Sequence, residues 1–192
     1  VSSFQAYALR SHTANPTGQQ QLKWNNPLVF WLRGEISVPA LRNAIESIVR
    51  RHSIFRTVYA RRGDDDFAQI VRSVGRNPLK FQQVQNESAA IDVARSDIET
   101  SMDLFGGDVF RCRLIKVDSS PARYLLVVIM HHIMFDHSAT KILLDEMDAF
   151  YCHYSDSIGR KQDKYENLIE KLPPQYMDFV RWQREISNHP II

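Results

Sequence analysis

Three of the seven histidines in this chain lie close together, at His131, His132 and His137, and Asp136 lies among them. The group follows Leu125–Met130, an apolar run typical of a strand buried on both faces. Imidazole titrates near neutral pH and can take a proton from an incoming nucleophile. Because adjacent residues on a strand point to opposite faces, we expect one histidine of the pair to face a cleft and the other to pack beneath it. The alternative is that both are packed, hydrogen-bonded histidines without a chemical role.

The chemistry of Asp136 is open from the residues alone, since a carboxylate there could be a base, a metal ligand or an ion-pair partner. A charge buried at a strand end needs a partner, and Arg56 is a candidate because it begins a neighbouring predicted strand. A metal site is the competing interpretation. His132, Asp136 and His137 fit part of the His-x-His-x-Asp-His pattern of metallo-β-lactamase-like hydrolases, but Met134 stands where the middle histidine would be.

The elements that must position this group alternate between strands and helices. Short apolar or alternating runs predict strands at 28–32, 55–60, 67–71, 109–117 and 124–130. Apolar residues at helical spacing predict helices over 38–51, 88–102 and 142–154, and a last helix carrying Tyr176, Phe179 and Val180. The first 25 residues are expected to be an irregular lead-in, and 159–171 a charged spacer. This alternation predicts an α/β or α+β sandwich-type fold.

Composition excludes several classes of protein. The 192 residues are 44% hydrophobic and 24% charged, which is enough apolar side chain for a core and argues against a disordered chain. The net charge of +2 lacks the basic excess of a dedicated nucleic-acid binder, and the longest apolar run is too short to cross a membrane. The two cysteines, Cys112 and Cys152, cannot form a disulfide framework, so we expect a reducing, cytoplasmic setting.

Three ordered segments together resemble the condensation domains of nonribosomal peptide synthetases, which belong to the chloramphenicol acetyltransferase-like superfamily. The first is His131-His132-x-x-x-Asp136, which resembles the active-site motif of the family. Residues 51–59 look like its Arg-His-x-x-Leu-Arg-Thr-x-Phe segment, and residues 176–183 look like its Tyr-x-Asp-Phe-x-x-Trp-Gln segment. Because the three occur in the family's order across most of the chain, chance agreement is a poor explanation.

The resemblance implies a fold and a set of partners. It implies a two-layer sandwich, a mixed sheet with helices packed on one face, forming one half of a V-shaped pseudo-dimer. All the matching segments belong to the N-terminal subdomain, so residues 1–192 are expected to be that subdomain with the C-terminal subdomain absent. Donor and acceptor carrier proteins would bring phosphopantetheine-linked substrates to a tunnel between the two halves. No cofactor or metal would be bound directly, and neither nucleic acid nor membrane would be a partner.

The resemblance also implies residue roles and a reaction, the condensation of a carrier-bound acyl or peptidyl thioester with an amine or hydroxyl acceptor. His132 matches the catalytic histidine, which would deprotonate or orient the acceptor or stabilise the tetrahedral intermediate. His131 matches the structural histidine, and Asp136 matches an aspartate that pairs with the arginine at Arg56. His137 is a departure, since the family normally has glycine there. A histidine there would modify the acceptor side, or would accompany a non-catalytic carrier-docking or product-release domain. The segment from Met130 to Ser138 resembles that of condensation-like domains of fungal polyketide synthases and polyketide–peptide hybrids.

The same resemblance extends to the end of the chain. Tyr176 and Trp182 match family positions on the last helix of this half, where they look like packing residues.

Overall fold

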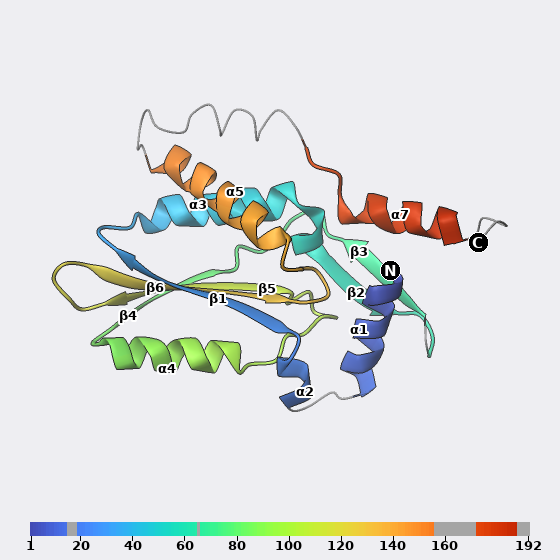
Figure 1. Ribbon diagram of the computed structural model, residues 1–192, viewed down its shortest axis with the longest axis horizontal. Coiled ribbons are helices and arrows are strands. Elements are labelled where there is room, and N and C mark those ends of the chain that lie inside the picture. The colour runs from blue at the N-terminus through green and yellow to red at the C-terminus, as the bar shows by residue number, and fades with distance from the viewer. Residues whose placement is uncertain (15–18, 65, 156–171, 188–192) are drawn as a thin grey trace.

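A four-stranded mixed sheet lies at the centre of the molecule, with the strand order β1–β6–β5–β4 (Figure 1). The computed structural model describes residues 1–14, 19–64, 66–155 and 172–187. The strands of this sheet are β1 (Asn25–Arg33), β4 (Leu79–Val84), β5 (Phe110–Val117) and β6 (Arg123–His131). β6 is antiparallel to both of its neighbours, whereas β4 and β5 are parallel. The mixed sheet agrees with the expected fold class.

Helices cover both faces of this sheet (Figure 1). On one face lie α3 (Val38–Arg51) and α5 (Ala139–Tyr154), and on the other lies α4 (Glu87–Ile98). Alternate residues of β6 supply the two cores: Leu126, Val128 and Met130 join the α3–α5 side, while Leu125, Val127 and Ile129 join the α4 side. The expectation of helices on one face alone is therefore wrong, because a strand that is apolar on both faces needs cover on both.

The helix predicted over 38–51 has these bounds in the structure. Its start is set by Ser37, whose side-chain oxygen accepts a hydrogen bond from the backbone N–H of Ala40 (3.3 Å), and by Pro39 in the first turn. The apolar stripe of this helix is buried against the sheet and α5. Burial of that face, more than helix propensity, holds the element in place.

A separate hairpin extends from the end of α3. A short 3-10 turn, η1 (Ser53–Arg56), leads into β2 (Thr57–Arg61), which pairs antiparallel with β3 (Phe67–Val71). The hairpin and both of its strands were predicted from alternation and the Gly–Asp turn.

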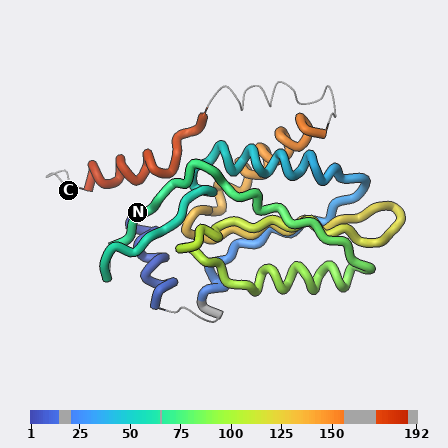
Figure 2. Tube along the Cα trace, turned by 180° about the vertical axis from the view of Figure 1, so that it is seen from behind, coloured from blue at the N-terminus to red at the C-terminus, as the bar shows by residue number. Residues whose placement is uncertain are grey.

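Apart from the short turn η1, two helices and one strand were not predicted. The polar lead-in contains two helices, α1 (Ser3–Ala14) and α2 (Gln19–Leu22), so the expectation of an irregular segment is wrong. Figure 2 shows α1 beside the β2–β3 hairpin, where Gln5 Nε2 donates to Tyr59 Oη (3.0 Å). The strand is β4. The predicted charged spacer at 159–171 lies outside the described residues.

The last described helix, α7 (Tyr176–Ser187), lies at the periphery of the molecule (Figure 1). Tyr176 Oη and Ser2 Oγ share a hydrogen bond (2.9 Å), so α7 is tied to the chain start. Trp182, expected to be a packing residue, is 56% exposed, which corrects that expectation. Within the described part of the chain, no helix combines the length and apolar character that crossing a membrane requires.

Candidate functional site

The histidine group lies where β6 ends, and the backbone there is held by hydrogen bonds to two other segments and by one within its own turn. The N–H of His131 donates to the carbonyl oxygen of Val109 (3.0 Å), and the N–H of His132 donates to that of Trp24 (2.8 Å). The N–H of Met134 then donates back to the carbonyl oxygen of His131 (3.1 Å), which closes a tight turn. These three hydrogen bonds hold the backbone segment that carries His132.

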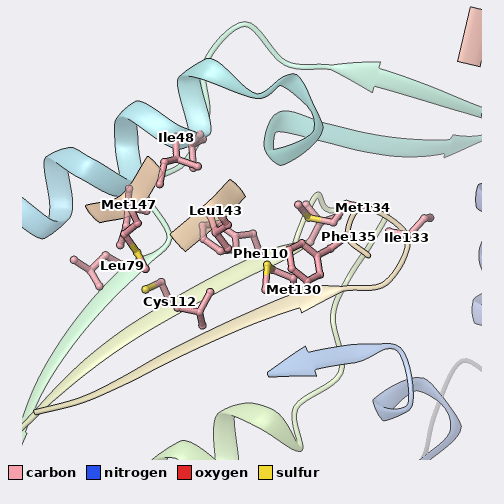
Figure 3. Close-up of a cluster of buried hydrophobic side chains, with 14 of the residues drawn as sticks. Ile48, Leu79, Phe110, Cys112, Met130, Ile133, Met134, Phe135, Leu143 and Met147 are labelled. Atoms are coloured by element: carbon pink, nitrogen blue, oxygen red, sulfur yellow. The ribbon is translucent and has the colours of Figure 1, made fainter. Parts of the chain in front are cut away.

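Side chains of the following loop reinforce this anchoring. Ile133, Met134 and Phe135 are buried in the core on the α3–α5 side, beside Phe110 and Met130 (Figure 3). A loop whose apolar side chains are packed in this way behaves as part of the rigid core, which is a suitable support for a reactive group.

His131 is the packed member of the histidine pair. Its ring is only 1% exposed, stacks on Trp24 (ring centroids 6.0 Å apart) and accepts a hydrogen bond at Nδ1 from the N–H of Ile133 (3.0 Å). Burial, followed by the nearby imidazoles of His12 and His132, lowers the pKa of His131 to about 3. The side chain is therefore neutral at physiological pH, and its contacts are those of a packing residue.

His132 is half-buried, so part of its imidazole is open to solvent. The ring lies edge-on to Phe4 (centroids 5.8 Å apart) and Trp24 (6.2 Å), and its Nδ1 is buried without a hydrogen-bond partner. Part of the ring is open to solvent while Nδ1 is buried, so a bound molecule can reach the imidazole only from its solvent-open side. The two histidines therefore differ in burial, as expected for adjacent residues at a strand end, with His131 packed and His132 half-buried.

The expected ion pair between Asp136 and Arg56 does not form. Asp136 is exposed, and its Oδ1 accepts a hydrogen bond from the N–H of Ala139 (2.9 Å) at the start of α5. Arg56 donates from Nε to the carbonyl oxygen of Val49 (3.1 Å), near the end of α3, and from its guanidinium to that of Arg72. The physical reason is that an exposed carboxylate needs no buried counter-ion, while Arg56 satisfies one carbonyl group near the end of α3 and one just after β3.

His137, the residue that departs from the family pattern, is exposed in the turn before α5. Its carbonyl oxygen accepts a hydrogen bond from the N–H of Thr140 (3.2 Å). Among the residues that the structure describes, no group of three or more His, Cys, Asp or Glu side chains is arranged to hold a metal ion. The described geometry therefore gives the metallo-hydrolase interpretation no support.

A buried ionic cluster that was not predicted from the sequence joins α3 to α5. Glu146 is 5% exposed and accepts hydrogen bonds from Arg51 Nε (3.1 Å) and from His52 Nε2 (2.6 Å). The Arg-His of the 51–59 segment thus has a structural use on the α3–α5 side. Acidic residues are almost never fully buried unless they are paired, so Glu146 within the apolar stripe of its helix was the available signal.

Aromatic neighbours of the site were also missed, because they come from the polar lead-in. Phe4, Trp24 and His12 surround the histidine pair. Large aromatic side chains isolated in a polar segment were the signal that the segment packs against something.

Solved structures that share this fold include condensation domains. The condensation domain from the monacolin K polyketide synthase MokA superposes with a TM-score of 0.71 at 28% identity, covering 97% of this chain and 38% of that chain. The starter condensation domain of the rhizomide synthetase RzmA gives a TM-score of 0.78 at 16% identity, covering 98% of this chain and 43% of that one. The fold is therefore that of condensation domains, in the chloramphenicol acetyltransferase-like class.

Sequence comparison agrees with the fold. The condensation domain family model matches residues 6–190. The nonribosomal peptide synthetase dtxS1 of Metarhizium robertsii is 31% identical over 163 residues, 83% of this chain and 2% of that protein. Surfactin synthase subunit 2 of Bacillus subtilis is 27% identical over 184 residues, 94% of this chain and 4% of that protein. The chain belongs to the condensation domain family, and it spans a small part of these synthetases and less than half of the two solved chains.

Proposed function

We propose that this chain is the N-terminal subdomain of a condensation domain and supplies His132 as the proton-transferring group. The reaction would join a carrier-bound acyl or peptidyl thioester to an amine, or to a hydroxyl. One observation carries the proposal: part of the His132 imidazole is open to solvent, on a turn whose backbone N–H groups from 131 to 134 are all hydrogen-bonded, while the adjacent His131 is sealed in the core.

The proposed step balances through one imidazole. The acceptor nitrogen attacks the thioester carbonyl carbon, so a C–N bond forms and the C–S bond breaks. His132 takes the proton from the attacking nitrogen and gives it to the departing sulfur, which leaves as a neutral thiol. The imidazole returns to its starting state, as a general acid–base catalyst must.

Two kinds of partner follow from the proposal. The C-terminal subdomain would close the far side of the site, and donor and acceptor carrier domains would deliver their substrates on phosphopantetheine arms. The family relationship to nonribosomal peptide synthetases supports these partners at the level of the class. The roles proposed for this chain's own residues need no bound cofactor or metal.

The test compares variants of the complete condensation domain that contains this chain. A carrier-bound thioester and an amine are supplied, and product is measured by mass spectrometry. Replacing His132→Ala is expected to lower product formation roughly a hundredfold or more, as for loss of a general base. His153→Ala is the matched control, because His153 is exposed on α5 away from this site. Unchanged product formation by His132→Ala would show that the assignment is wrong.

A second function, carrier docking or product release without catalysis, is favoured by one residue, His137. In the same assay His137→Gly separates the two functions. If the domain is catalytic as it stands, we expect His137→Gly to change turnover only a few fold, since the exposed side chain supports no packing. Product from neither wild type nor His132→Ala, with a large gain in His137→Gly, would establish the non-catalytic function.

A further inference from the structure

Several buried polar atoms around the end of β6 have no hydrogen-bond partner. They include Nε2 of His131, Nδ1 of His12 and Oδ1 of Asn25. His131 is 1% exposed and Asn25 is 9% exposed. Buried polar atoms are nearly always hydrogen-bonded, so a cluster of orphaned atoms calls for a specific explanation.

The hydrogen bonds of His131 define its tautomer. Nδ1 accepts from the N–H of Ile133 (3.0 Å), so this nitrogen carries no proton in the neutral ring. The single proton of the neutral imidazole must then lie on Nε2, which is buried. His131 therefore presents a donor, Nε2–H, that needs an acceptor in the same enclosed region.

The two other orphaned atoms are both able to accept. The side-chain amide of Asn25 is oriented by Nδ2, which donates to the carbonyl oxygens of Ile98 (2.9 Å) and Thr100 (3.2 Å), so Oδ1 is the free atom. The ring of His12 is partly buried, and burial lowers its pKa, so the neutral form is favoured; in the tautomer with the proton on Nε2, its Nδ1 is an acceptor.

Placement on the fold brings these atoms to one region. Asn25 is directly opposite His131 in the β1–β6 pair, so their side chains leave the sheet on the same face. The rings of His12 and His131 meet edge-on with centroids 6.2 Å apart. A cavity of about 550 Å³ is lined in part by His12, so there is space for water next to this residue.

We propose that His12 and Asn25 are positioning residues that act on His132 through His131 and one bound water. The water accepts the Nε2–H of His131 and donates its two protons to His12 Nδ1 and Asn25 Oδ1. Each orphaned atom is then satisfied, and the water has three polar partners, a typical number for an internal water.

The tautomer of His131 determines whether the turn that carries His132 keeps one of its hydrogen bonds. While its proton stays on Nε2, His131 can accept the N–H of Ile133 and hold the turn that carries His132. Removing the acceptors favours the other tautomer, in which Nδ1 carries the proton and cannot accept that hydrogen bond. The turn then loses one of the bonds that define the position of His132.

Nuclear magnetic resonance of ¹⁵N-histidine in the complete domain tests the tautomer directly. Near neutral pH the wild type is expected to show His131 as neutral, with a protonated Nε2 and an unprotonated Nδ1. His12→Phe keeps an aromatic ring but removes the acceptor, so the His131 signals should shift toward the other tautomer. His12→Gln restores an acceptor and should restore the signals. A wild-type spectrum that places the proton of His131 on Nδ1 overturns the inference without any variant. Unchanged His131 signals in His12→Phe overturn it as well.

The effect on the site rests on the proposed function and is measured as turnover. His12→Phe is expected to lower kcat roughly five- to tenfold with little change in KM, as for loss of one hydrogen bond. His12→Gln should recover most of it, and His153→Phe, on the exposed side of α5, is the matched control. If His12 has a purely structural role, His12→Phe will lower thermal stability and His12→Gln will not restore kcat. That outcome counts against the inference. If His132→Ala leaves product formation unchanged while the His131 signals respond to His12, the proposed function fails and the network stands.

Discussion

Two adjacent imidazoles at the end of β6 experience different surroundings. The ring of His131 is enclosed by Trp24 and His12, while His132 retains solvent access beside Phe4. The difference arises because the side chains of adjacent residues on a strand point to opposite faces. Strand periodicity predicts this division but cannot say which histidine is enclosed, since that depends on the lead-in segment folding over the strand end; the family resemblance was what favoured His131.

The buried state of His131 makes the stability of the domain pH-dependent. Its pKa is about 3 in the folded protein against an ordinary value of 6.5, so below pH 6.5 the unfolded chain binds a proton that the folded protein does not. Stability from this group is full above pH 6.5 and falls as the pH drops toward 3, by roughly 2 kcal/mol between about pH 7 and about pH 5. Urea unfolding of the complete domain at the two pH values measures the loss.

The matched variants for this pH effect are His131→Asn, which keeps an oxygen able to accept the N–H of Ile133, and His153→Asn. The first should reduce the pH dependence by about that amount, and the second should leave it unchanged. Equal pH dependence in wild type and His131→Asn would contradict the assignment.

At the scale of elements, the contact between α3 and α5 depends on Glu146. This carboxylate accepts from Arg51 and His52 at an almost fully buried position. Removing one partner of a buried ionic cluster leaves the others without compensation, so Glu146→Ala is expected to lower the free energy of unfolding by roughly 3 kcal/mol. Asp145→Ala, on the exposed side of the same helix, should cost less than about 1 kcal/mol. Chemical denaturation of both variants measures the two losses in the free energy of unfolding. Similar losses would show that Glu146 has no special role in stability.

The elements differ in how much of them the sequence could predict. The helix over 38–51 carries its own cap at Ser37 and a full apolar stripe, and the predicted and observed bounds agree. β4 was missed because Leu79 is its only buried residue, so no alternation marks it. α1 was missed because it is held by contacts distant in sequence, such as that of Gln5 with Tyr59, which no local pattern records. The predicted Arg56–Asp136 pair was wrong for the same reason, because the distance between residues far apart in the sequence cannot be read from a local pattern.

At the scale of the whole molecule, exposed apolar side chains gather on α7. Phe179, Trp182 and Ile186 are 44%, 56% and 38% exposed, and their spacing of three and then four residues places them along one face of the helix. Only Val180 of this helix is buried. Soluble monomers rarely expose a contiguous apolar stripe, so we expect this face to be covered in the complete protein.

That exposed stripe determines how the 192-residue chain should behave when expressed alone. Apolar area that nothing covers favours association, so the isolated chain is expected to self-associate as its concentration rises in sedimentation velocity experiments. The double variant Phe179→Ser/Trp182→Ser should sediment as a monomer over the same range. Ile142→Ser is the matched control, because Ile142 is also exposed (56%) but lies on α5, outside the stripe, and its replacement should leave association unchanged. A wild-type chain that stays monomeric, or a double variant that associates equally, would show that this face of α7 needs no cover.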